Sequence, residues 1–246
     1  MKAIGESMMN IRVMEIRNYL LQPHTTQHFI DNFEANFITT LEAEGMAVLG
    51  QFRVLDAPDR FVWLRGYPDM EARRVSLHAF YDGPVWQKFR TFTNSMLVDS
   101  DHVHLLRPVG DISGLTAGLT ARSVAHGLSE ASLSPQTGLV AIDYYRSGAG
   151  QREAMVERVL AAYQRAGIPV RGAFVAEVEP NNFPRHPVLQ DPDLLAVITA
   201  FDWDECGQHA DLPHAIAAEL GGLLAGSPET LLLEPTLRSP LRYMGK

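Results

Sequence analysis

The sequence predicts an α+β fold made of two ferredoxin-like (βαββαβ) repeats whose sheets pack against each other. Three observations lead to this prediction: a short motif occurs twice, further matches flank it in the same order, and strand and helix patterns alternate in each half. The motif x-Gly-apolar-x-Val-x-Gly-x-Phe occupies residues 44–52 and again 166–174. Such self-similarity within one chain indicates a repeated structural unit, so it is the starting point for the fold.

Further matches extend the repeat in both directions. Residues 15–19 match 141–145, residues 61–67 match 195–201, and residues 104–109 match 231–236. The spacing between copies changes only where a loop or a helix could gain or lose residues. We therefore divide the chain into repeat 1 at 11–109, a linker at 110–137 and repeat 2 at 138–243. The linker is rich in Gly, Ser, Ala and Thr and lacks aromatic residues, which is typical of a connection between units.

Repeat 1 begins with a strand expected at 13–20, where apolar and polar side chains alternate. After Pro23 the period lengthens, with phenylalanines four residues apart, which predicts an amphipathic helix. Gly45 suits the position just beyond the end of that helix. The remaining elements expected in repeat 1 are strands at 47–55, 61–67 and 102–107 and a helical region at 70–96 that is broken at Asp82-Gly83-Pro84.

Repeat 2 follows the same order of elements. Its first helix carries Met155 and Tyr163 and ends at Gly167, and its last helix is expected to begin near Asp211. Four prolines fall within 180–192, so this segment is predicted to be a loop between the middle strands. A sheet with helices on one face leaves its other face bare, and two units in one chain can cover each other by packing sheet against sheet.

Composition and charge limit the possible functions. The 246 residues are 46% hydrophobic and 20% charged, which is typical of a soluble globular protein. The net charge of −8 with no basic run argues against nucleic acid as a partner. No apolar run approaches the ~18 residues of a membrane span, and residues 1–12 lack the apolar core of a secretory signal, so no membrane partner is expected. The single cysteine, Cys206, allows no intramolecular disulfide and fits a reducing, cytoplasmic location.

Several short stretches share a pattern with a known family. In repeat 1 they are Met14–Tyr19, the series Tyr67, Asp69, Glu71 and Arg73, the pair Pro84-x-Trp86, and the ending Leu105-Leu106-Arg107-Pro108; in repeat 2 the ending Leu232-Leu233-Glu234-Pro235 is similar. Together they resemble a NIPSNAP domain. The resemblance implies the dimeric α/β-barrel superfamily, in which two ferredoxin-like units form a barrel from facing sheets, here within one chain. The resemblance is closer in repeat 1, because repeat 2 has Asp143 at the position of Arg17 and lacks a Pro-x-Trp pair.

The resemblance implies a range of activities and no particular catalytic residue. Relatives in the superfamily include cofactor-free monooxygenases, haem-handling enzymes, lactone isomerases and ligand-binding proteins. Fold similarity alone therefore does not choose a function, which has to be argued from the site.

The first candidate site lies on the first strand and its neighbour. Alternation places Glu15, Arg17 and Tyr19 on one face, joined by Arg65, and this face is expected to point away from the helices and toward the other repeat. An arginine there could hold a carboxylate or phosphate through paired hydrogen bonds. Alternatively the residues form a polar cluster between the sheets, because a buried charge must be paired. The repeat favours this second interpretation, with Arg17 paired to Asp143.

Histidines supply the candidates for catalysis. His102 and His104 lie two apart on a strand and could share a metal, but the spacing places no third ligand, so no metal is expected. His104, or His78 on the helix, could instead accept a proton in a pocket, since a histidine titrates near neutral pH.

Aromatic residues on the last helix of repeat 1 supply a candidate pocket. The helical spacing of Trp86 and its neighbours indicates a packed core, or alternatively an apolar pocket between helix and sheet. Tyr81, His78 and Arg90 would then be polar groups at the edge of that pocket. Because repeat 2 lacks the tryptophan, any such site is expected only in repeat 1.

The sequence leaves two classes of function open. It contains no dinucleotide-binding glycine motif, phosphate-binding loop or nucleophile elbow, so no cofactor is expected. The first class is a cofactor-independent small-molecule enzyme, of monooxygenase or isomerase type, acting on an apolar or aromatic ligand. The second is a non-catalytic ligand-binding or protein-interaction scaffold. Exposed sheet edges could also pair with a second copy of the chain, so a homodimer is compatible with the sequence.

Overall fold

The computed structural model describes residues 10–117, 119 and 138–243. Most of the linker predicted at 110–137 therefore lies outside the described residues. We refer to residues 10–109 as the first half and 138–243 as the second half. Within the described residues, no helix has the length and apolar character needed to cross a membrane.

Eight of the nine described strands close into a barrel. The strands are β1 (Val13–Leu21), β2 (Ala47–Val54), β3 (Ala57–Tyr67), β4 (Leu97–Asp99), β5 (Val103–Pro108), β6 (Leu139–Arg146), β7 (Val170–Ala176), β8 (Leu194–Phe201) and β9 (Glu229–Pro235). Their order is β3-β2-β9-β6-β8-β7-β5-β1, and the ring closes because β1 also pairs with β3. Each pairing in the ring is antiparallel. The short β4 pairs with β1 outside the ring, so β4 carries the free sheet edge in the described part of the chain, and a homodimer formed through edges stays a prediction.

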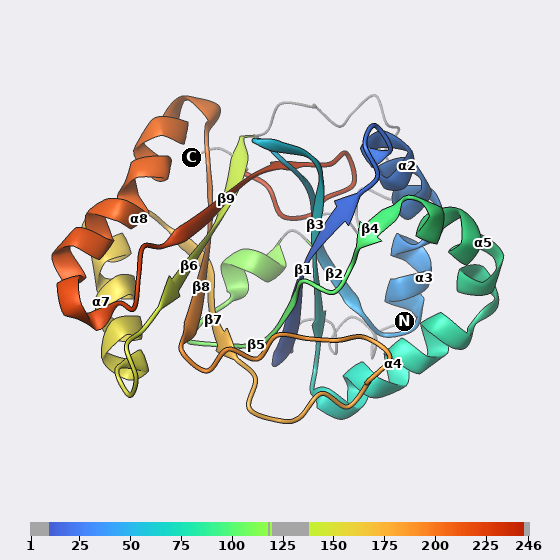
Figure 1. Cartoon of the computed structure of the whole chain (residues 1–246), viewed down its shortest axis with the longest axis horizontal. Helices are drawn as coiled ribbons and strands as arrows, with labels where there is room; N and C mark the ends of the chain where they lie inside the picture. The colour runs from blue at the N-terminus through green and yellow to red at the C-terminus, as the bar shows by residue number, and fades with distance from the viewer. Residues whose placement is uncertain (1–9, 118, 120–137, 244–246) are drawn as a thin grey trace.

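The two halves contribute equal parts of the barrel. The strand order is β2-β3-β1-β5 in the first half and β7-β8-β6-β9 in the second. Two pairings join the halves, β2 with β9 at Phe52 and Pro235, and β5 with β7 at Leu106 and Ala176. Figure 1 shows the strands gathered in the centre of the molecule, with the helices of each half on opposite outer sides.

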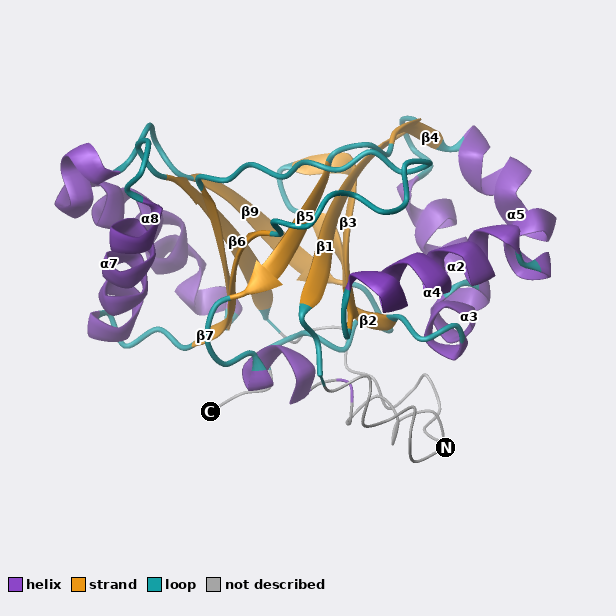
Figure 2. Cartoon of the chain, turned by 90° about the horizontal axis from the view of Figure 1, so that it is seen from below, coloured by secondary structure: helices purple, strands orange, loops and turns teal. Residues whose placement is uncertain are grey.

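The helices cover the outer faces of the barrel, as Figure 2 also shows. The first half carries α2 (Thr26–Asn36), α3 (Ile38–Ala43), α4 (Met70–Asp82) and α5 (Pro84–Ser95); the second carries α7 (Arg152–Arg165) and α8 (Cys206–Leu220). The helix expected after Pro23 is divided in two at Phe37. The predicted break before Pro84 is present, and this proline opens α5.

The last helix begins earlier than predicted. It starts at Cys206 rather than near Asp211, so Pro213 lies inside it rather than at its first turn. A short 3-10 turn precedes α8, and there Asp202 and Glu205 form a reciprocal capping box that starts the helical segment. The capping pair, and not the proline, therefore sets where the helix begins.

The strand β1 is buried on both faces, and the prediction for its orientation was wrong. Met14 and Ile16 belong to the core inside the barrel, whereas Tyr19 belongs to the layer beneath the helices of the first half. Glu15, Arg17 and Tyr19 therefore face their own helices and not the other half. Alternation separates the two faces of a strand but does not say which face meets the helices. The face that carries Met14 and Ile16 lines the interior of the barrel.

The interior of the barrel is a packed core. It is filled by apolar side chains from both halves, among them Phe52, Leu64, Leu106, Val140, Ile198 and Leu233. Leu115, from the segment that follows β5, joins the same core and is fully buried. Burial of such a continuous apolar surface is the main force that holds the two halves together.

The first half is expected to self-associate when residues 10–109 are produced alone. Without the second half, the inner faces of β1, β2, β3 and β5 would expose a large apolar patch to water. Light scattering measures the molar mass of the purified fragment in solution, with the full chain as the control. A fragment that stays monomeric and unfolds cooperatively would contradict the prediction.

Candidate functional site

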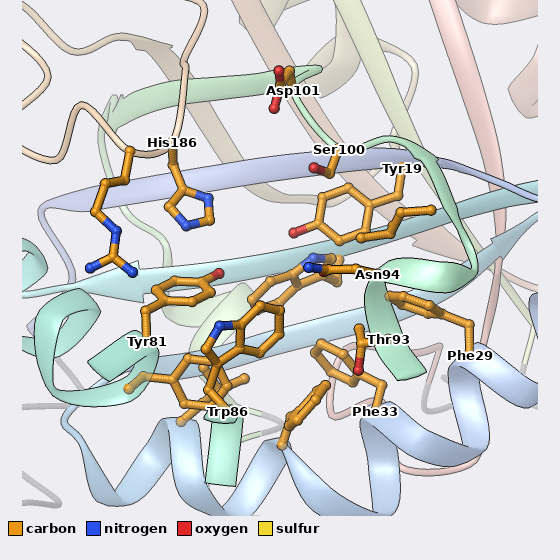
Figure 3. Close-up of a pocket in the computed structure, with 16 residues that line it drawn as sticks. Tyr19, Phe29, Phe33, Tyr81, Trp86, Thr93, Asn94, Ser100, Asp101 and His186 are labelled. Atoms are coloured by element: carbon orange, nitrogen blue, oxygen red, sulfur yellow. The ribbon is translucent and has the colours of Figure 1, made fainter. Parts of the chain in front are cut away.

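A cavity of about 230 Å³ lies between the helices and the sheet of the first half. Its walls are aromatic, with Tyr19 and Tyr81 joined by Phe29, Phe33, Phe37, Trp63, Phe80 and Trp86. Its polar edge includes Asn94, Ser100, Asp101 and His186 (Figure 3). An apolar cavity with a few convergent polar groups is typical of a small-molecule site.

The local sequence explains how these aromatic walls form. Phe29 and Phe33 lie four residues apart on α2, and Phe33 packs edge-on against Trp63 of β3, with ring centroids 4.9 Å apart. On the other side, the break at Gly83 starts a new helix, and Trp86 in its first turn packs at 5.0 Å against Tyr81. The cavity is the space left between these two groups of rings.

A loop of the second half closes one side of the cavity. It is the proline-containing segment 180–192 between β7 and β8, and it places Phe183 and His186 against the ring of Tyr81, at 6.0 and 4.3 Å. Asn182 of the same loop accepts a hydrogen bond from Nη1 of Arg73 at 2.9 Å. The site in the first half is therefore completed by residues of the second half.

Several polar groups of the cavity have hydrogen-bonding capacity to spare. Figure 3 shows the hydroxyl groups of Tyr19 and Tyr81 pointing toward one another, with the ring of His186 beside them. Within the described residues, the Tyr81 hydroxyl has no hydrogen-bond partner, and the buried Nε1 of Trp63 has none either. The Tyr81 hydroxyl is therefore the group of this pair that a ligand in the cavity could contact.

Behind the cavity lies a buried charge cluster centred on Glu15. Its carboxylate is 2.5 Å from Arg17, 2.7 Å from Arg65 and 2.7 Å from Arg73, and the four side chains are at most 1% exposed. Burial alone would raise the pKa of Glu15, but the guanidinium groups of Arg65, Arg17 and Arg73 outweigh it and hold that pKa well below its usual value. The carboxylate is therefore ionised, and it faces three positive charges.

The predicted pairing of Arg17 with Asp143 is not present. Arg17 donates to Glu15 and to the hydroxyl of Tyr19, whereas Asp143 accepts hydrogen bonds from Tyr163 and Thr230, each at 2.6 Å. Each strand turns these side chains toward the helices of its own half, so the apolar core of the barrel separates them. Burial raises the pKa of Asp143 to about 6, since no cation lies close enough to reverse the effect.

The structure brings some of the predicted site residues together. Tyr81 and Trp86 line the cavity, where the pocket interpretation of the sequence placed them, and Tyr19, which was expected to face the other half, lines it as well. Arg17 and Arg65 do not line it but lie over the indole ring of Trp63, at 5.7 and 5.0 Å. The two arginines thus form a positively charged layer behind one aromatic wall.

The other predicted residues lie elsewhere. His104 points into the barrel against Tyr144, 5.1 Å away, and burial lowers its pKa to about 4. His78 is exposed and lies 3.1 Å from Asp82. Arg90 is exposed on α5. None of these three lines the cavity of the first half.

Sequence reasoning missed the contribution of His186. The available signal was the length of the connection between β7 and β8, since the corresponding strands of the first half, β2 and β3, are joined by a tight turn. Within the described residues, no group of three or more His, Cys, Asp or Glu side chains is arranged to hold a metal ion.

The strands form an α/β barrel, and its first half contains a candidate small-molecule pocket. Residues 14–112 match the family model described as NIPSNAP, so the resemblance predicted for the first half is confirmed. An uncharacterized NIPSNAP-like domain protein from Burkholderia xenovorans is 26% identical over 41% of this chain and 88% of its own, with a TM-score of 0.38.

Several solved structures are similar over almost the whole chain. One is a proposed monooxygenase from Lactobacillus acidophilus NCFM (TM-score 0.57, 11% identity, 92% of this chain and 94% of that chain). Another is an anthrone oxidase-like protein (TM-score 0.55, 9% identity, 94% of this chain and 93% of that chain). At such low identity these similarities show the fold alone. No curated protein matches the sequence.

Replacing Glu15 with Gln is expected to destabilise the protein by about 3 kcal/mol or more at neutral pH, because three buried guanidinium groups lose their counter-charge. Urea unfolding measures the change. The pKa of Glu15 is lower in the folded state than in the unfolded chain, where it is about 4.3. The contribution of the Glu15 carboxylate to the free energy of unfolding is therefore present above about pH 4.3 and is lost as the pH falls toward the folded-state pKa. The difference between wild type and variant should therefore shrink in acid.

A matched control for this variant is Glu71→Gln, which removes an exposed carboxylate paired with Arg74. It should leave stability nearly unchanged, because exposed ion pairs contribute little. Equal effects of the two substitutions would show that the Glu15 cluster does not stabilise the fold.

Proposed function

We propose that the two halves are tandem ferredoxin-like repeats, at 11–109 and 138–243, joined by a linker at 110–137. Two observations support this proposal. The elements follow the same order in both halves, strand, helix, two strands, helix and strand, with β4 as an addition in the first. The strand orders β2-β3-β1-β5 and β7-β8-β6-β9 also correspond position by position.

We propose that the chain binds a flat apolar or aromatic molecule in the cavity of the first half. We further propose that it acts on this molecule without a tightly bound cofactor, as an enzyme of monooxygenase or isomerase type. The observation that carries the proposal is the aromatic-walled cavity, with Tyr19, Tyr81 and Trp86 around it. The similarity of the fold to that of a proposed monooxygenase and of an anthrone oxidase-like protein is consistent with this chemistry.

The size of the cavity limits the ligand. A cavity of about 150 Å³ holds one benzene molecule. The space of about 230 Å³ thus suits one ring with substituents or two fused rings. A tetrapyrrole needs several hundred Å³, so a cavity of this size favours a small ligand over a haem-sized one.

A non-catalytic binding protein is the second candidate, and one observation favours it. His186 is the histidine that lines the cavity, and burial, together with the positive charges of Arg17 and Arg65, lowers its pKa to about 3. A group with so low a pKa is a weak proton acceptor at neutral pH. His104 and His78, the bases expected from the sequence, lie outside the cavity.

Trp86→Ala is expected to weaken the binding of toluene and benzamide about tenfold, because an aromatic wall of the cavity is lost. Ligand-observed NMR titration measures this. Trp203→Ala is the control, since Trp203 is partly exposed in the second half. If neither probe binds, or if the two variants bind alike, the cavity is not the binding site.

A separate experiment distinguishes the enzyme from the binding protein. Native mass spectrometry of protein purified from its own host should reveal a retained small molecule, and an oxygen electrode should detect oxygen uptake with phenols and quinols. Retention without turnover of any such substrate would support the binding protein.

A further inference from the structure

The hydroxyl of Tyr19 is a hydrogen-bond donor directed into the cavity. Its oxygen accepts a hydrogen bond from Nε of Arg17 at 2.7 Å. Burial raises the pKa of Tyr19, although Arg17 opposes this, so the hydroxyl keeps its proton at neutral pH. Because Arg17 occupies the oxygen as a donor, the hydroxyl proton is left to be donated elsewhere. The side chain lines the cavity, so a ligand atom placed there could accept this proton.

His186 provides a second donor through the same arginine. Nδ1 of its ring lies 3.4 Å from Nη2 of Arg17. An arginine side chain has donors and no acceptor, so Nδ1 is the acceptor in this contact. In a neutral imidazole the proton then resides on Nε2, which makes Nε2–H a donor. Tyr19 and His186 are thus both hydrogen-bonded to one guanidinium group, and both line the cavity.

The charge behind these donors is unbalanced. Three guanidinium groups surround the single carboxylate of Glu15, and within the described residues no other carboxylate forms an ion pair with them. The faces of Trp63 and Tyr67 stabilise Arg65, but aromatic rings carry no net charge. Nη2 of Arg73 is buried without a partner. Uncompensated buried charge is costly, so an anion bound nearby would lower the energy of the cluster.

We propose that the ligand is anionic: a flat aromatic carboxylate or phenolate whose charged oxygen accepts hydrogen bonds from the Tyr19 hydroxyl and from Nε2–H of His186. This inference rests on the proposed function, that the cavity binds a flat ligand. Both donors are polarised by Arg17, and hydrogen bonds to charged acceptors are about twice as strong as neutral ones. The rest of the ligand lies among the aromatic rings that line the cavity.

Benzoate and benzamide test the inference, because they have nearly the same shape and differ in charge. We expect wild-type protein to bind benzoate about tenfold more tightly than benzamide in NMR or calorimetric titrations. Tyr19→Phe keeps the ring and removes the hydroxyl, so it should reduce the benzoate preference severalfold. Tyr145→Phe is the matched control: it removes the hydroxyl of a buried tyrosine in the second half, bonded to Tyr163, and should leave the preference unchanged.

The outcomes separate this inference from the proposed function. If wild-type protein binds benzoate and benzamide equally, the ligand site is not selective for anions and the inference fails, while the proposed function stands. If neither probe nor toluene binds, the proposed function itself fails. If Tyr19→Phe does not fold, the ratio of the wild-type affinities for benzoate and benzamide still tests the inference. His186→Phe, which also removes a hydrogen-bond donor, then replaces Tyr19→Phe as the variant.

Discussion

The carboxylate of Glu15 is the contact on which the first half of the molecule depends. It joins three arginines from three different elements, β1, β3 and α4, in a region closed to water. Two of these arginines extend the connection to the second half, since Arg73 donates to Asn182 and Arg17 contacts His186. One buried charge therefore fixes the strand pair, the helix above it and the loop that arrives from the other half. Removing that charge would leave three buried cations close together without the carboxylate that pairs with them.

The same cluster explains why the two halves are not equivalent. At the positions of Glu15 and Arg17 the second half has Ala141 and Asp143, and among the residues that the structure describes its helix layer has no ion-pair network of this kind. Asp143 is satisfied instead by the hydroxyls of Tyr163 and Thr230. Charge and cavity thus occur together in the first half. The second half contributes a loop in place of a second set of charges.

Much of the fold followed from the sequence, because period and turn residues report local structure. The order of strands and helices, the break before Pro84 and the shared face of Glu15, Arg17 and Tyr19 were predicted in this way. The orientation of that face was not predicted correctly, because both faces of β1 are buried and alternation does not show which face packs against the helices. The place of His186 was beyond sequence reasoning as well, since the path of a long loop is decided by tertiary contacts, here with Tyr81 and Arg17.

A site built from both halves gains from their covalent connection. The loop at 180–192 must pack against the cavity each time the chain folds. Because both halves belong to one chain, this contact is intramolecular, and each half is present at a high effective concentration relative to the other. It also permits specialisation: one half keeps the charged cluster and the aromatic walls, while the other keeps the loop that carries His186. A ligand that contacts both Tyr19 and His186 would bind only the assembled barrel, so its binding energy would add to the stability of the contact between the halves. Under the proposed function, ligand affinity and barrel assembly would therefore be coupled through Tyr19 and His186, which both contact Arg17 beside Glu15.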